Sequence, residues 1–250
     1  MLRSTNELLG YRILASDGKI GKVDDFYLDD QSWMLRYLVV DTDSILPGPK
    51  VLLIPSLLVE PKWEEKAIPV LISKEKVRKS PDVDTRKPVS RQHEEKILGE
   101  FGIDPYWVAH AHHWGGQIGT PLEELKKKTE TSAEEARDEK DYHLRSLKEI
   151  KSYGFHAVDG DIGHVDDFII DEQNWRLRYM VVDTRNWLPG RKVLISVSWI
   201  DRVNWGESKV RTVLERDQIK NSPEFDPSAP VNREYEERLY DFYGRPKDWP

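Results

Sequence analysis

The chain repeats itself at a constant offset of 142 residues, and this repeat constrains the fold more than any other feature. Residues 17–42 align with residues 159–184 without a gap, and 18 of the 26 positions are identical. The same offset continues through shorter matches as far as Gly102 and Gly244. A module of about 100 residues can bury a core of its own. The sequence therefore predicts two copies of one such module.

The repeat divides the chain into three parts. We predict a first module over residues 1–107, a linker over 108–145 and a second module over 146–250. The linker is rich in charged residues and has almost no aliphatic ones after Leu125, so it cannot form a core.

Composition excludes several classes of function. The net charge of -7 argues against general affinity for nucleic acid, which depends on clustered lysine and arginine. The absence of cysteine removes disulfides, thiolate nucleophiles and cysteine-ligated metals. No apolar run approaches the length of a transmembrane helix. We expect a cytoplasmic protein without a transmembrane segment.

Short strands separated by glycine and proline predict an all-β fold. In the first copy they are expected at residues 11–15, 20–29, 34–41, 51–54, 57–60 and 67–71. The run at 34–41 has few polar residues, which is typical of a strand buried on both faces. We predict two tandem, small antiparallel β-barrels. Each is followed by a helical turn (73–79 and 215–221) and a short helical arm (91–101 and 233–243).

Four motifs shared by both copies resemble those of the PRC-barrel family. They are DGxIGxVDDF, RYxVVDT, LPGxKVLI and the proline-containing arm that follows each barrel. The family is named for the cytoplasmic domain of the photosynthetic reaction centre H subunit and includes a domain of the ribosome maturation factor. The resemblance implies two barrels that dock on other macromolecules, with no catalytic centre in the fold. It also gives photosynthetic or respiratory electron transport as a family-level expectation.

Two pairs of adjacent aspartates invite an acid/base interpretation, because neighbouring carboxylates can share a proton. Consecutive residues of a regular strand point to opposite faces, which separates the two carboxylates. Apolar Val23 and Phe26 flank the first pair and are three residues apart, so we predict a β-bulge at each pair that keeps both apolar side chains inward, with salt bridges to an arginine on the next strand. The residues are Asp24, Asp25 and Arg36 in the first copy, and Asp166, Asp167 and Arg178 in the second.

The only candidate metal ligands that stand close together in the sequence are His110, His112 and His113. Their spacing matches no standard site, and no carboxylate is nearby, so we predict a solvated loop and no metal or other cofactor. No phosphate-binding loop or Ser-His-Asp series is present, and we expect no enzymatic activity.

Aromatic residues of the second copy are the candidate interaction residues, because large aromatic side chains anchor many interfaces. Trp187 and Trp199 have no tryptophan at the equivalent positions of the first copy, so the shared fold does not require them. The second arm adds Tyr235, Tyr240 and Tyr243. Each arm is expected either to pack on one of the barrels or to act as a docking peptide for another protein.

The leading functional hypothesis is a non-enzymatic module that binds a protein complex, including a membrane-associated complex at the periphery of the inner membrane. We expect the two copies to pair as a homodimer does, about an approximate two-fold axis, and a homo-oligomer is left open. The alternative is a stress protein that responds to a small molecule or a metal. It would use the cleft between the barrels or the loop from His110 to His113.

Overall fold

The structure, a computed structural model, describes residues 1–42, 50–80, 89, 91–105, 143–184, 191–247 and 249. The first copy contains β1 (Leu2–Ser4), α1 (Thr5–Leu8), β2 (Arg12–Ala15), β3 (Gly18–Asp29), β4 (Met34–Asp41), β5 (Lys50–Leu53), η1 (Pro55–Leu57), β6 (Ala67–Pro69), α2 (Lys74–Lys79) and α3 (Arg91–Phe101). The second copy contains β7 (Leu144–Ser146), α6 (Leu147–Ile150), β8 (Gly154–Ala157), β9 (Gly160–Asp171), β10 (Arg176–Asp183), β11 (Lys192–Ser196), η2 (Val197–Trp199), β12 (Ile200–Asn204), β13 (Lys209–Thr212), α7 (Arg216–Asn221) and α8 (Arg233–Tyr243). Most equivalent elements keep the 142-residue offset, and strands predominate in both copies.

The strands form one 13-stranded mixed sheet in place of the two antiparallel barrels that we predicted. Its main path runs β12-β13-β8-β9-β10-β4-β3-β2-β6, so it passes from the second copy to the first through β10 and β4. The pairs β2–β6 and β8–β13 are parallel, and the other pairs of the sheet are antiparallel. The strands that the structure describes form no closed barrel. The expected strand at 57–60 is reduced to a bridge between Leu58 and Val70.

The strand predicted to be buried on both faces is buried as expected. Leu38, Val39 and Val40 of β4 have no exposed surface, and the equivalent run of β10 from Met180 to Val182 is at most 1% exposed. Consecutive residues of a strand alternate between its faces, so both faces are covered. Burying each of these side chains contributes about 1.5–3 kcal/mol, which makes the two strands the centre of the core.

The two copies meet at the turns that precede β4 and β10. The Leu35 backbone N–H donates to the Trp175 carbonyl at 2.9 Å, and the Leu177 N–H donates to the Trp33 carbonyl at 2.8 Å. Both tryptophans are left-handed, with φ of 58° and 57°. Because each bond is the repeat-equivalent of the other, the contact has the reciprocity of a two-fold axis.

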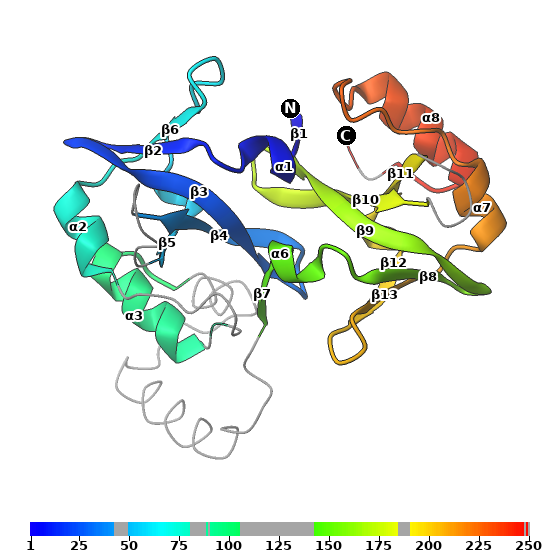
Figure 1. Ribbon diagram of the computed structural model, residues 1–250, viewed down its shortest axis with the longest axis horizontal. Coiled ribbons are helices and arrows are strands. Elements are labelled where there is room, and N and C mark those ends of the chain that lie inside the picture. Colours follow the sequence, from blue (N-terminus) through cyan, green and yellow to red (C-terminus); the bar gives the residue numbers. More distant parts are fainter. Residues whose placement is uncertain are drawn as a thin grey trace, which may run out of the picture.

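Each copy also gives its first strand to the other copy. Strand β1 pairs with β9 and not with its own copy, and β7 pairs with β3. Figure 1 shows β1 and β7 near the middle of the molecule, where the two copies join. Both strands read Leu-Arg-Ser, so the repeat begins earlier than the sequence motifs suggested. Most of the predicted linker lies outside the described residues, but its last two, Leu144 and Arg145, belong to β7.

The helical arms lie at the two outer ends of the molecule (Figure 1). Helix α8 is capped at its start by Asn232, whose side chain accepts from the Tyr235 N–H, and at its end by Gly244 in the left-handed conformation. The Tyr179 hydroxyl donates to Glu236 of α8 at 2.6 Å, and the equivalent bond joins Tyr37 and Glu94 of α3 at 2.9 Å. Each arm therefore packs on its own copy, which is one of the two roles that we expected.

Candidate functional site

The doubled aspartates lie at β-bulges, as the sequence predicted. The register between β3 and β4 shifts between Val23 and Asp25, and the register between β9 and β10 shifts at the equivalent place. Asp25 is buried, with 2% of its surface exposed, whereas the Asp24 side chain is 23% exposed. The bulge thus sends one carboxylate of each pair inward and leaves the other near the surface.

The buried aspartates bind the first residues of the opposite copy. Asp25 accepts hydrogen bonds from the Ser146 hydroxyl and from the Lys148 backbone N–H at 3.1 Å. Asp167 accepts from the hydroxyls of Ser4 and Thr5, the latter at 2.8 Å. Burial raises the pKa of Asp25, although the bonds from Ser146, the Phe26 N–H and the Lys148 N–H act in the opposite direction. We call these reciprocal contacts the aspartate clasps.

The predicted arginine partners of the aspartates are wrong. Asp24 pairs with Lys50 and, at 2.6 Å, with Lys148, while Arg36 pairs with Asp29 at 3.0 Å. In the second copy Asp166 pairs with Lys192 at 2.7 Å, and Arg178 lies 3.5 Å from Glu236. The register explains the difference, because Arg36 stands between the partners of Tyr27 and Leu28, and Arg178 between the partners of Ile169 and Ile170, away from the aspartate pairs.

Three of the aromatic interaction candidates are inside the protein. Trp199 is 4% exposed and packs on Tyr240 and Tyr243, with ring centroids 5.1 and 4.6 Å apart. Burial raises the pKa of Tyr243 to about 12. These side chains hold α8 on the sheet and cannot serve as exposed anchors. Tyr235 is partly buried, and its hydroxyl donates to the Pro223 carbonyl at 3.1 Å. Trp187, His110, His112 and His113 lie outside the described residues.

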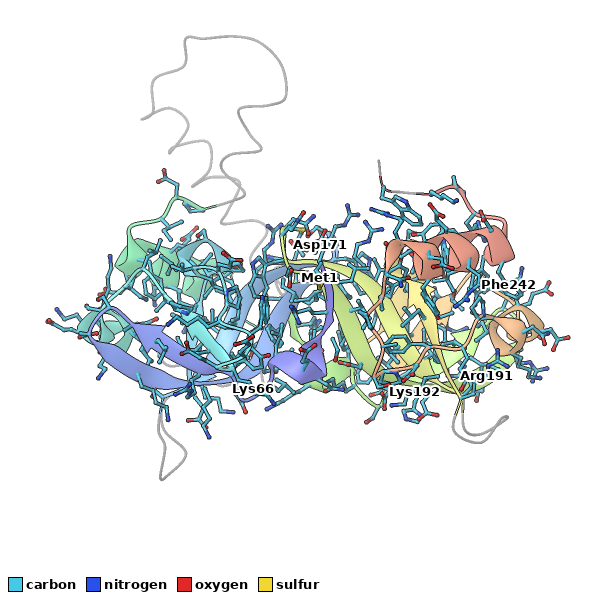
Figure 2. The ribbon with its side chains drawn as sticks, turned by 90° about the horizontal axis from the view of Figure 1, so that it is seen from above. Met1, Lys66, Asp171, Arg191, Lys192 and Phe242 are labelled. Carbon is cyan, nitrogen blue, oxygen red and sulfur yellow. The ribbon has the colours of Figure 1, made fainter. Side chains whose placement is uncertain are left out.

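A groove of about 700 Å³ lies between the N-terminal strand, the β9–β10 turn and the start of α8. Its basic side chains are Arg176, Arg178 and Arg233, and Trp249 supplies an aromatic side. The Arg233 guanidinium lies 4.7 Å from the Trp249 ring centroid, a cation–π distance. Figure 2 shows Met1 and Asp171, which also line this arginine groove, side by side. Sequence reasoning missed the groove because its residues come from distant segments.

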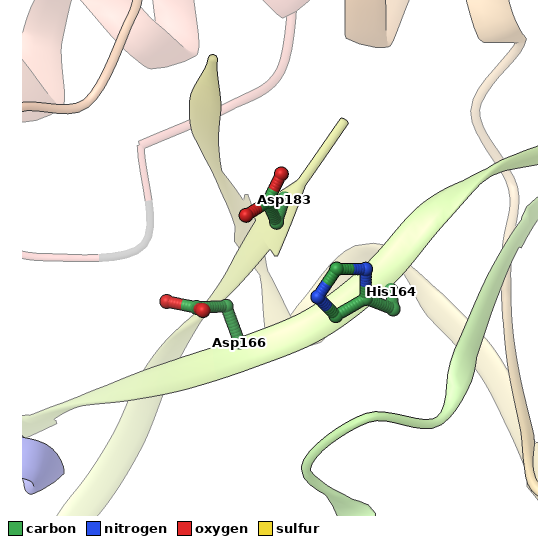
Figure 3. Close-up of side chains that lie close together, drawn as sticks. All are labelled: His164, Asp166 and Asp183. Carbon is green, nitrogen blue, oxygen red and sulfur yellow. The ribbon is translucent and has the colours of Figure 1, made fainter. Parts of the chain in front are cut away.

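A third feature could hold a metal ion. His164 and Asp166 of β9 and Asp183 of β10 each offer one ligand atom, and these atoms lie within 4.8 Å of one another (Figure 3). Imidazole and carboxylate are ligands that divalent metals use in proteins. The spacing of His164 and Asp166, two apart on a strand, was a usable signal. The register that brings in Asp183 was not visible in the sequence.

Among the helices that the structure describes, none is long and apolar enough to cross a membrane.

A comparison with curated proteins finds no match to this chain. A family model matches residues 154–213, which run from β8 to just beyond β13 of the second copy. That model is the PRC-barrel domain, so this part of the chain is similar to a family that indicates, in general terms, a module for protein interaction or assembly.

Proposed function

We propose that this protein is a non-enzymatic assembly module that binds an acidic segment of a partner protein in the arginine groove. The observation that carries the proposal is the collection of three arginines and a tryptophan around one hollow. A guanidinium presents its donors in a planar fork that matches a carboxylate, and its charge persists at any physiological pH. The PRC-barrel match supports the general class of function.

The electrostatics of the groove favour a carboxylate-bearing occupant. Its lining includes two acidic residues, Asp171 and Glu236, against three arginines. Glu236 accepts from Tyr179 and lies 3.5 and 3.4 Å from Arg178 and Arg233, so its single negative charge is shared between two arginines. The groove also includes the first residues of α8, where the helix dipole favours negative charge. The local charge is therefore positive in a chain whose net charge is -7.

The way in which the two copies are joined suits a protein that acts as a scaffold. The aspartate clasps and the exchanged strands join the two copies to each other, and the groove contains residues from both ends of the chain. The association with a membrane-bound electron-transport complex stays a family-level prediction, supported only by the resemblance to the reaction centre H subunit.

Affinity capture from the native cell tests the proposal when it compares matched charge reversals. The test variant is Arg176→Glu with Arg233→Glu, both in the groove. The control is Arg202→Glu with Arg238→Glu, which changes the same charge at exposed positions outside it. We expect a partner that the wild type and the control retain and that the groove variant binds at least about tenfold more weakly. Equal capture by all three proteins would contradict the proposal.

A second candidate function, a metal-responsive protein, is favoured by one observation, the cluster of His164, Asp166 and Asp183. This cluster is separate from the arginine groove, with which it shares no lining residue.

A further inference from the structure

The cluster in the second copy is built by two neighbouring strands, β9 and β10, and β11 lies beside β10. His164 of β9 is the direct Cα partner of Asp183 of β10, and Asp183 is in turn the partner of Lys192 of β11. Directly opposed residues of antiparallel strands point to the same face, and Asp166, two residues from His164, shares that face. The sheet therefore holds an imidazole and two carboxylates together without any loop (Figure 3).

We propose that His164, Asp166 and Asp183 bind a divalent first-row transition-metal ion, and that Zn²⁺ can occupy the site. One nitrogen and two oxygen ligands are a donor set that suits such ions. Three protein ligands leave a further coordination position for water or for a group of a bound partner.

In the first copy, lysine side chains stand beside the equivalent aspartates. Asp24 and Asp41, the equivalents of Asp166 and Asp183, line a hollow of about 310 Å³ together with Lys22 and Lys148. The Lys148 ammonium lies 2.6 Å from Asp24, so a lysine supplies positive charge to this hollow directly. Two lysines thus share one hollow with two carboxylates.

The second copy lacks both of these lysines. At the repeat offset, His164 replaces Lys22 and Asn6 replaces Lys148, while the two aspartates are kept. Lys151 stands where the first copy has Leu9, which lines the first-copy hollow, and it bonds to Asn6 and lies 3.8 Å from Asp167. The second copy therefore has one lysine at these positions where the first has two, and a bound cation would make up the missing positive charge.

The remaining contacts are compatible with an ion. Lys192 pairs with Oδ2 of Asp166 at 2.7 Å, but a carboxylate has a second oxygen that can act as a ligand. Asp183 is 1% exposed, and a buried carboxylate is stabilised by metal coordination. Strand β10 approaches β9 closely at Asp183. This approach requires a glycine at position 163, because a Cβ there would lie 2.0 Å from the Asp183 carbonyl oxygen.

Calorimetric titration with Zn²⁺ tests the site in the full chain. The background protein carries His110→Ala, His112→Ala and His113→Ala, which removes the other clustered imidazoles. We expect one ion per chain in this background. His164→Lys installs the residue that the first copy uses, so it keeps the fold, and it should weaken Zn²⁺ binding by at least about 100-fold. The thermal unfolding temperature without metal checks that the variant is folded.

Two further measurements make the outcome decisive. Paramagnetic Co²⁺ should perturb backbone NMR signals most strongly in residues 162–168 and 182–184. The double variant Lys22→His with Lys148→Asn copies the second-copy residues into the first and should add a second ion. No Zn²⁺ binding in the background protein, or binding that survives His164→Lys unchanged, would overturn the proposal.

Discussion

The Ser146 hydroxyl, at the start of the second copy, donates a hydrogen bond to the buried carboxylate of Asp25 in the first copy. The equivalent bond runs from Ser4 to Asp167 in the opposite direction. Each serine is also the N-cap of the short helix that follows its exchanged strand. One hydroxyl thus ends the strand, starts the helix and ties the segment to the other copy.

Replacing either clasp serine by alanine should destabilise the whole protein. Ser4→Ala and Ser146→Ala each leave a buried carboxylate with one donor fewer, which costs about 1–3 kcal/mol. Urea unfolding measures the loss. Ser228→Ala is the control, because Ser228 also donates to an aspartate, Asp226, but in an exposed turn. The control should change stability by no more than about 0.5 kcal/mol. Equal effects at Ser146 and Ser228 would count against the clasp.

Two equivalent glycines are required by the close approach of neighbouring strands. A Cβ at Gly21 or Gly163 would lie 2.0 Å from the carbonyl oxygen of Asp41 or Asp183. Gly21→Ala and Gly163→Ala should each cost about 3 kcal/mol or more, because the backbone must move. Gly99→Ala in α3, where a Cβ meets nothing within 4 Å, should instead stabilise by about 1 kcal/mol. Thermal unfolding of the three variants checks the opposite signs.

The pH dependence of the unfolding free energy should show how much the charged carboxylate of Asp29 stabilises the fold. Burial alone would raise the pKa of this carboxyl, but bonds from the Ser32 N–H, Arg36 and the Gln31 N–H outweigh burial and lower it. A carboxyl whose pKa is lowered by folding stabilises the protein above its unfolded pKa of about 3.9, and this stabilisation is lost as the pH falls through the folded pKa.

The variant that tests this prediction is Asp29→Asn, which keeps one acceptor oxygen but loses the charge. The difference in unfolding free energy between wild type and variant should be largest near neutral pH and should shrink below about pH 4. Urea titrations across this range measure it. A difference that stays constant with pH would show that the charge of Asp29 contributes nothing to the folded state.

Much of the architecture could be predicted from local sequence. The bulges followed from Val23 and Phe26, which are three residues apart and flank the aspartate pair, and the arm helices begin and end where the sequence placed them. The PRC-barrel resemblance is confirmed for residues 154–213. These features depend on spacing and turn chemistry, which act over a few residues and are legible in one chain.

The exchange of strands could not be predicted, because a repeat makes it ambiguous. Leu2–Ser4 and Leu144–Ser146 are identical in sequence, and β3 and β9 share 8 of 12 residues, so own-copy and exchanged pairing offer the same backbone pattern and similar apolar side chains. The burial of Trp199 could not be predicted from the sequence either. Its absence from the first copy suggested a surface residue, but it fills space against the larger tyrosines of the second arm.

The exchanged pairing is the central structural claim, and engineered disulfides test it most directly. The chain has no cysteine, so two introduced thiols can react only with each other within a monomer. Leu2 is the Cα partner of Asp171, and Leu144 is the partner of Asp29. We predict that the cysteine pairs 2/171 and 144/29 form intrachain disulfides under mild oxidation, detected by mass spectrometry of unreduced peptides. The pairs 2/29 and 144/171 use the same four positions and should stay reduced. Crosslinking of these own-copy pairs, with the exchanged pairs unreacted, would contradict the account.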